Sequence, residues 1–98
     1  MTPSEARLTL YSRDYCHLCH DMLAALEALR GEAPAGFVVD VVDVDAHPDA
    51  ALVERYDELV PVLVAVALEG DGSRELCHYF LDRPAVLDYL GEFARRRA

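Results

Sequence analysis

The chain has 98 residues, which is the length of one domain and leaves no room for a second. An apolar content of 53% indicates a folded globular protein and argues against a disordered one. Acidic residues outnumber basic ones by 18 to 9, and the resulting net charge of −9 argues against binding to nucleic acids or to anionic membrane surfaces.

The N-terminal residues and the cysteine count bear on the cellular compartment. The first residues, MTPSEARLTLYS, lack the apolar core of a signal peptide, and no run approaches the roughly 20 apolar residues of a membrane span. We therefore expect a cytoplasmic protein without membrane association. Three cysteines are an odd number, unlike a disulfide framework, and in a reducing compartment a C-x-x-C motif is more typical of catalysis or metal binding than of a structural disulfide.

The first half of the chain predicts two strands and two helices. Residues 7–12 alternate apolar and polar side chains, which is typical of a strand. An apolar stripe at helical spacing covers residues 18–29, and Gly31 is expected to end this helix. Residues 37–45 are rich in valine and predict a second strand, and residues 47–59, with a proline in the first turn, predict a second helix.

The second half of the chain predicts two more strands and a last helix. Residues 60–68 form a continuous apolar run, the pattern of a strand that is buried on both faces. Residues 69–73, EGDGS, contain the Asp-Gly signal of a hairpin turn, and residues 74–81 predict the fourth strand. Asp82 is positioned to cap a helix whose apolar residues continue to Ala94. The element order is therefore β-α-β-α-β-β-α, in one compact α/β sandwich.

Two groups of charged residues have more than one explanation. Asp40, Asp43 and Asp45 in the second predicted strand could bind a metal ion, or they could be charges that protect an exposed sheet edge from pairing. We favour the sheet edge. The arginines at 95–97 could contact nucleic acid, but they also suit the negative end of the last helix, and the acidity of the chain favours the helix end.

The segment RDYCHLCH, residues 13–20, is compatible with three kinds of chemistry. Cys16 and Cys19 could be a redox dithiol, and with His20 they spell C-x-x-C-H, the attachment motif of a c-type haem. Haem attachment needs an exported, oxidising context, which the chain does not indicate. Cys16 and Cys19 with either His17 or His20 offer a partial ligand set for zinc, but no second C-x-x-C or H-x-x-x-H is present to complete it. A metal ion or iron–sulfur cluster shared between two subunits remains an alternative.

The position of Cys16 favours a reactive thiolate. Cys16 follows the first strand and opens the first helix, so unpaired backbone N–H groups and the positive end of the helix dipole should face its sulfur. Arg13 adds a positive charge nearby, whereas Asp14 acts the other way. We expect a lowered pKa, within the roughly 3.5–7.5 range of such cysteines. Cys19 lies one turn further on the same face, so Cys16 should attack a disulfide and Cys19 should resolve the mixed disulfide.

Two segments, LTLYSRDYCHLC near the start and LVPVLVAV some forty residues later, resemble the glutaredoxin-like proteins of the thioredoxin superfamily. The resemblance covers residues 7–97. We expect residues 1–98 to form a single domain of this kind, with residues 7–97 as its core. The resemblance implies an α/β fold, a thioredoxin-like (glutaredoxin-type) sandwich with a four-stranded mixed sheet. It also implies that Pro61 is a cis-proline lying against the dithiol, and that the backbone of Val60 pairs with a bound disulfide substrate.

The resemblance implies a thiol–disulfide oxidoreductase that uses the Cys16–Cys19 dithiol without a cofactor. Its partner would be a disulfide-containing protein or a glutathione mixed disulfide, with glutathione as a co-substrate, and we expect a monomer. Two alternatives stay open. One is a carrier of a metal ion or an iron–sulfur cluster, and the other is a non-enzymatic thioredoxin-like adaptor whose dithiol is vestigial.

The sequence departs from the glutaredoxin pattern at two places. His17 stands where glutaredoxins usually have proline; it is either a residue that tunes the redox poise when protonated or an exposed residue at a helix start. The Gly-Gly-Asp turn that holds glutathione after the fourth strand is replaced by FLDRPAV. Arg13 fits a glutathione carboxylate, but the acidity of the chain does not favour that ligand. Cys77 is expected to be a small buried side chain rather than a third redox thiol.

Overall fold

The computed structural model describes residues 5–13, 16–46, 60–66 and 74–97. Within them lie four strands and two helices: β1 (Ala6–Ser12), α1 (His17–Leu29), β2 (Phe37–Asp43), β3 (Val62–Ala65), β4 (Arg74–His78) and α3 (Arg83–Arg97). The predicted helix at 47–59 and the predicted turn at 69–73 lie outside the described residues.

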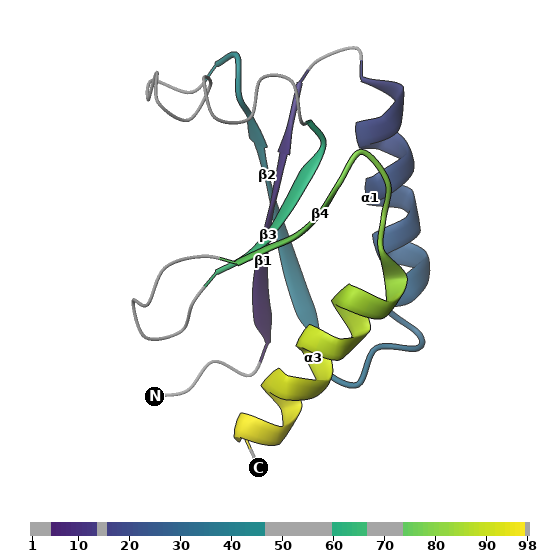
Figure 1. Cartoon of the computed structure of the whole chain (residues 1–98), viewed down its shortest axis with the longest axis vertical. Helices are drawn as coiled ribbons and strands as arrows, with labels where there is room; N and C mark the ends of the chain where they lie inside the picture. The colour runs from purple at the N-terminus through teal and green to yellow at the C-terminus, as the bar shows by residue number, and fades with distance from the viewer. Residues whose placement is uncertain (1–4, 14–15, 47–59, 67–73, 98) are drawn as a thin grey trace.

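The four strands form one mixed sheet in the order β2-β1-β3-β4. Strands β1 and β2 are parallel, as expected for a strand–helix–strand unit, whereas β3 is antiparallel to both β1 and β4. Helices α1 and α3 lie on the same side of this sheet (Figure 1). The predicted α/β architecture with a four-stranded mixed sheet is confirmed.

The main core fills the space between the sheet and the two helices. It contains thirteen buried residues: Ala6, Leu8, Leu10, Met22, Leu26, Leu29, Phe37, Leu63, Ala65, Cys77, Val86, Leu90 and Phe93. A second cluster, made of Val44, Val62 and Val64, is separate from it. Strand β3 contributes alternate residues to the two clusters and is buried along its whole length, as its continuous apolar run predicted.

Three predicted strands are shorter in the structure than in the sequence pattern. Strand β2 ends at Asp43 because the chain turns there, with the Ala46 N–H bonded to the Asp43 carbonyl at 3.2 Å. Strand β4 ends at His78 because Tyr79 adopts a positive φ of 64°. Strand β3 begins at Val62, after a cis peptide bond. Apolar composition extends past the point where backbone geometry ends each strand.

Strand β2 is an edge of the sheet, which is the position that its acidic residues predicted. Asp40 binds the exposed Arg7 of the neighbouring strand, with 2.7 Å between Arg7 Nη2 and Asp40 Oδ2. Helix α3 begins after Asp82, whose Oδ1 accepts a hydrogen bond from the Ala85 N–H at 3.1 Å, and this N-cap also agrees with the prediction. In the part of the chain that the structure describes, no helix is long and apolar enough to cross a bilayer.

Candidate active site

The segments that carry the predicted site residues meet at one end of the sheet. Tyr11 near the end of β1 pairs with Val62 at the start of β3, and Val62 pairs with His78 at the end of β4. The chain runs from the end of β1 toward Cys16, and it enters β3 directly from Pro61. The register of the strands therefore places the start of α1, the residues before β3 and the residues after β4 at the same end.

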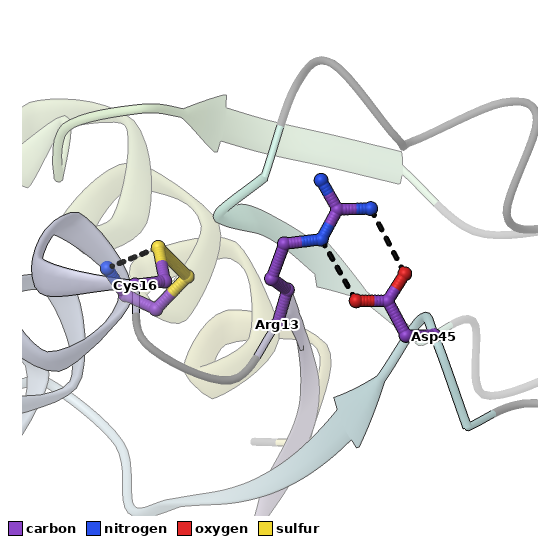
Figure 2. The surroundings of a disulfide bond; sticks show 4 residues. Arg13, Cys16 and Asp45 are labelled. Atoms are coloured by element: carbon purple, nitrogen blue, oxygen red, sulfur yellow. Dashed lines mark hydrogen bonds and ion pairs between the residues drawn. A yellow bond between two sulfur atoms is a disulfide. The ribbon is translucent and has the colours of Figure 1, made fainter.

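Cys16 and Cys19 are joined by a disulfide across the first turn of α1 (Figure 2). Their Cα atoms are 5.2 Å apart, which is a usual separation for a disulfide. Cys16 is the N-cap of α1, with an extended backbone, and its sulfur accepts a hydrogen bond from the Cys19 N–H at 3.1 Å. The sulfur of Cys16 therefore lies at the positive end of the helix, as the sequence predicted.

The two cysteines differ in exposure. Cys19 is buried, with 6% of its surface exposed, and it belongs to the inward face of α1 together with Met22 and Leu26. Cys16 is half-buried at the end of the helix. A substrate sulfur approaching from solvent therefore meets Cys16 first.

Arg13 is held by Asp45, which follows the end of β2. Two hydrogen bonds join them: Arg13 Nε to Asp45 Oδ2 at 2.9 Å and Arg13 Nη2 to Asp45 Oδ1 at 3.0 Å. Figure 2 shows the guanidinium turned toward Asp45 and away from the disulfide. This bidentate pair offsets the positive charge that Arg13 would otherwise offer to a thiolate or to a substrate carboxylate.

The two histidines of the motif lie on the outside of the first turn of α1. His17 is the first residue of the helix and His20 follows Cys19, and both are exposed. The backbone N–H of His20 donates to the Cys16 carbonyl at 3.2 Å, which closes the first helical turn. Within the described residues, no three His, Cys, Asp or Glu side chains are grouped so as to hold a metal ion.

Val60 and Pro61 precede β3, and the peptide bond between them is cis. Pro61 is buried, while Val60 is half-buried and packs against the second cluster. The Pro61 carbonyl accepts a hydrogen bond from the Tyr79 N–H at 2.9 Å. The residues before β3 are thereby tied to the residues that follow β4.

Sequence reasoning missed the residues that follow β4. The sequence pattern extends the fourth strand through Tyr79 and Phe80, but in the structure they form a turn at the end of the sheet that also bears the disulfide. Phe80 is 70% exposed. Asp45 was also missed as the partner of Arg13. Its position just after a strand parallel to β1 is the signal that could have found it, since such residues share one end of the sheet.

Cys77 lies apart from the dithiol, in the main core, where it pairs with Leu63 across the sheet. It is the free cysteine of the described residues and is buried, as predicted. Burial raises the pKa of its thiol, and a hydrogen bond from the Asp82 backbone opposes this to a smaller extent. Its environment therefore favours the protonated, unreactive thiol.

Comparisons with known proteins agree with this architecture. The chain matches the model of the glutaredoxin-like domain (DUF836) over residues 7–91. The solution structure of protein Ne2328 from Nitrosomonas europaea is 35% identical, with 91% of this chain and 95% of that one covered and a TM-score of 0.72.

Two thioredoxins share the fold at lower identity. Chloroplastic thioredoxin z is 20% identical over 94% of this chain and 80% of its own, with a TM-score of 0.67. The germline-specific thioredoxin Deadhead from Drosophila melanogaster is 20% identical over 91% of this chain and 81% of its own, with a TM-score of 0.57. No curated protein sequence matches the chain. The family match over most of the chain shows that this protein belongs to the glutaredoxin-like domain family (DUF836), on a thioredoxin-like fold.

Proposed function

We propose that this protein is a thiol–disulfide oxidoreductase in which Cys16 is the attacking cysteine and Cys19 the resolving one. The observation that carries the proposal is the hydrogen bond from the Cys19 N–H to the Cys16 sulfur at the start of α1. A thiolate is the nucleophile of disulfide exchange, and an N–H donor together with the positive end of a helix stabilises that anion. The difference in exposure between the two cysteines supports the order of attack.

The reaction proceeds through two exchanges. The Cys16 thiolate attacks one sulfur of a substrate disulfide, which forms a mixed disulfide and releases the other substrate sulfur as a thiol. The Cys19 thiolate then attacks the Cys16 sulfur, which forms the Cys16–Cys19 disulfide and releases the second substrate thiol. Two electrons and two protons pass from the protein dithiol to the substrate disulfide, and an external thiol reductant returns them. The oxidised product is the state that the structure contains.

The residues before β3 would hold the substrate during these steps. Val60 is half-buried at the end of the sheet that carries the dithiol, so the backbone of an extended substrate segment can align with it as an added strand. A disulfide-containing protein or a glutathione mixed disulfide could bind in this way, and we propose that the protein acts as a monomer in the cytoplasm.

Substitution of each cysteine tests the assigned roles. Cys16→Ser should reduce disulfide exchange to the uncatalysed rate, because the nucleophile is lost. Cys19→Ser should still attack but should accumulate a mixed disulfide with the substrate, because the resolving thiol is missing. Intact-mass spectrometry of each variant after mixing with a disulfide peptide distinguishes the two outcomes. Equal residual activity in both variants, or an adduct on Cys19 in wild type, would contradict the roles.

Equilibration of the purified protein in graded glutathione redox buffers tests the dithiol itself. After the remaining thiols are alkylated, intact-mass analysis should show that Cys16 and Cys19 lose their two hydrogens together, with a midpoint that gives the reduction potential. A glutathione adduct on Cys16 would identify glutathione as a partner. Unreactive thiols, or a metal ion that stays with the protein, would favour the cluster-carrier alternative instead.

A further inference from the structure

The turn after β4 has an unusual backbone. Tyr79 has a φ of 64°, and the Phe80 N–H donates to the His78 carbonyl at 2.7 Å, so the three residues form a γ-turn with a positive central φ. This kind of γ-turn is rare and strained, and a positive φ is exceptional for a bulky side chain. Backbone strain of this kind persists only where the surroundings hold it, and it is concentrated at active sites and ligand-binding segments.

One hydrogen bond holds the γ-turn beside the cis-proline: the Tyr79 N–H is bonded to the Pro61 carbonyl at 2.9 Å. Within the turn, the Tyr79 ring packs edge-to-face against the His78 ring with 4.8 Å between centroids. The turn is therefore fixed to the residues that we propose as the substrate-binding backbone.

The turn directs Phe80 into solvent. Phe80 is 70% exposed, the most exposed of the large apolar side chains that the structure describes, and it directly follows the residue bonded to Pro61. A single exposed apolar side chain is ordinary by itself. Packing does not explain why a strained turn holds an exposed phenylalanine here, at the end of the sheet that also bears the disulfide.

Two charged groups among the described residues at this end of the sheet are engaged with other parts of the protein. The Arg13 guanidinium is held by Asp45, and the Asp82 carboxylate caps α3. A ligand with several carboxylates, such as glutathione, meets an Arg13 whose positive charge Asp45 already offsets, and it approaches a chain with a net charge of −9. An uncharged apolar group meets neither obstacle at Phe80.

We propose that Phe80 is a specificity-determining residue that contacts an apolar side chain next to the reactive cysteine of a protein disulfide. The inference rests on the proposed function and names its substrate class: protein disulfides with an apolar neighbour, in preference to glutathione disulfide. The substrate segment lies along Val60 and Pro61 in extended form. One of its neighbouring side chains then covers the Phe80 ring and removes apolar surface of both partners from water.

The test compares three disulfides as substrates of the reduced protein. Two are peptides with the same intrachain disulfide that differ only in one residue beside the attacked cysteine, leucine or serine, and the third is glutathione disulfide. We expect kcat/KM for the leucine peptide to exceed that for the serine peptide by about tenfold, from the burial of one apolar side chain. Phe80→Ala should reduce this ratio to below about twofold while leaving the rate with glutathione disulfide unchanged.

Two further variants complete the experiment. Phe80→Leu should keep most of the preference, because it restores an apolar surface. Val38→Ala removes another exposed apolar side chain at the opposite end of the sheet and should change none of the three rates.

Equal rates with both peptides in wild type, or a uniform slowing of all three substrates by Phe80→Ala, would overturn the role of Phe80 while leaving the oxidoreductase proposal standing. Failure of wild type to reduce any of the three disulfides would overturn the proposed function as well.

Discussion

Cys16 and Cys19 have different surroundings although they are bonded to each other. The sulfur of Cys16 accepts a backbone hydrogen bond at the end of the helix, whereas Cys19 is buried on the inward face of α1. Arg13 lies three residues before Cys16 in the sequence, and its bidentate pair with Asp45 offsets its positive charge. The net charge of the segment that leads to Cys16 therefore depends on Asp45, which follows the end of β2.

Asp45→Asn tests this dependence. The amide keeps the size of the side chain but removes the negative charge that faces Arg13, so a larger fraction of reduced Cys16 should be thiolate at a given pH. We expect the midpoint of the pH profile of Cys16 alkylation by iodoacetamide to move to lower pH. The free energy of unfolding should fall by less than about 1 kcal/mol, because both side chains are partly exposed.

The matched control is Asp40→Asn. It removes the same charge from within β2, but its partner Arg7 lies near the start of β1, at the other end of the sheet. The alkylation profile of this variant should coincide with that of wild type. An equal displacement in both variants would show that overall charge, rather than the Arg13–Asp45 pair, acts on Cys16.

At the scale of elements, the start of α3 and the turn after β4 are close in sequence. Only Leu81 and Asp82 separate Phe80 from the first residue of α3. Asp82 satisfies the Ala85 N–H with its side chain, and its carbonyl accepts the first helical hydrogen bond, from the Val86 N–H at 3.1 Å. The end of β4 and the start of α3 are therefore both set by hydrogen bonds of the connecting residues.

Asp82→Ala should destabilise the protein by about 1 kcal/mol, the usual cost of losing an N-cap side chain. Equilibrium unfolding in urea measures the change, with the slope m expected to stay constant. Asp88→Ala is the control, since Asp88 is an exposed residue within the same helix and should change the stability by less than about 0.5 kcal/mol. Equal effects of the two substitutions would argue against the cap.

At the scale of the whole molecule, one core joins all four strands to α1 and α3. Cys77 lies in this core and is protonated in the folded state at a pH where the same thiol ionises in the unfolded chain, because burial raises its pKa. Above the unfolded-state pKa the unfolded chain binds fewer protons than the folded protein. The contribution of Cys77 to the free energy of unfolding should therefore be fully present below the unfolded-state pKa. It should fall as pH rises from there toward the folded-state pKa.

Cys77→Ala tests this linkage in the oxidised protein, in which Cys16 and Cys19 do not titrate. The variant should be less stable by about 1 kcal/mol at pH 7 because of the small cavity, but it should lose less stability than wild type between about pH 8 and 10. Urea unfolding at pH 7, 8.5 and 9.5 gives the comparison. Tyr89, whose pKa burial also raises, acts in the same direction at higher pH and is common to both proteins. Parallel pH curves for the two proteins would contradict the linkage.

The sequence by itself determined the order of the described elements, the burial of β3, the edge position of β2 and the place of Cys16 at the start of α1. These features depend on local periodicity, on capping residues and on the position of a motif between a strand and a helix, all of which can be read over a few neighbouring residues.

Only the tertiary structure showed that Arg13 is bound by Asp45 and that the strained turn at Tyr79 is bonded to Pro61. Each of these pairs joins segments that are distant in sequence, and the order and register of the strands bring them together. Apolar composition extended β4 through Phe80, because hydrophobicity does not reveal where a backbone turns. The contacts that set the charge and the apolar surface at the site are therefore decided by the fold.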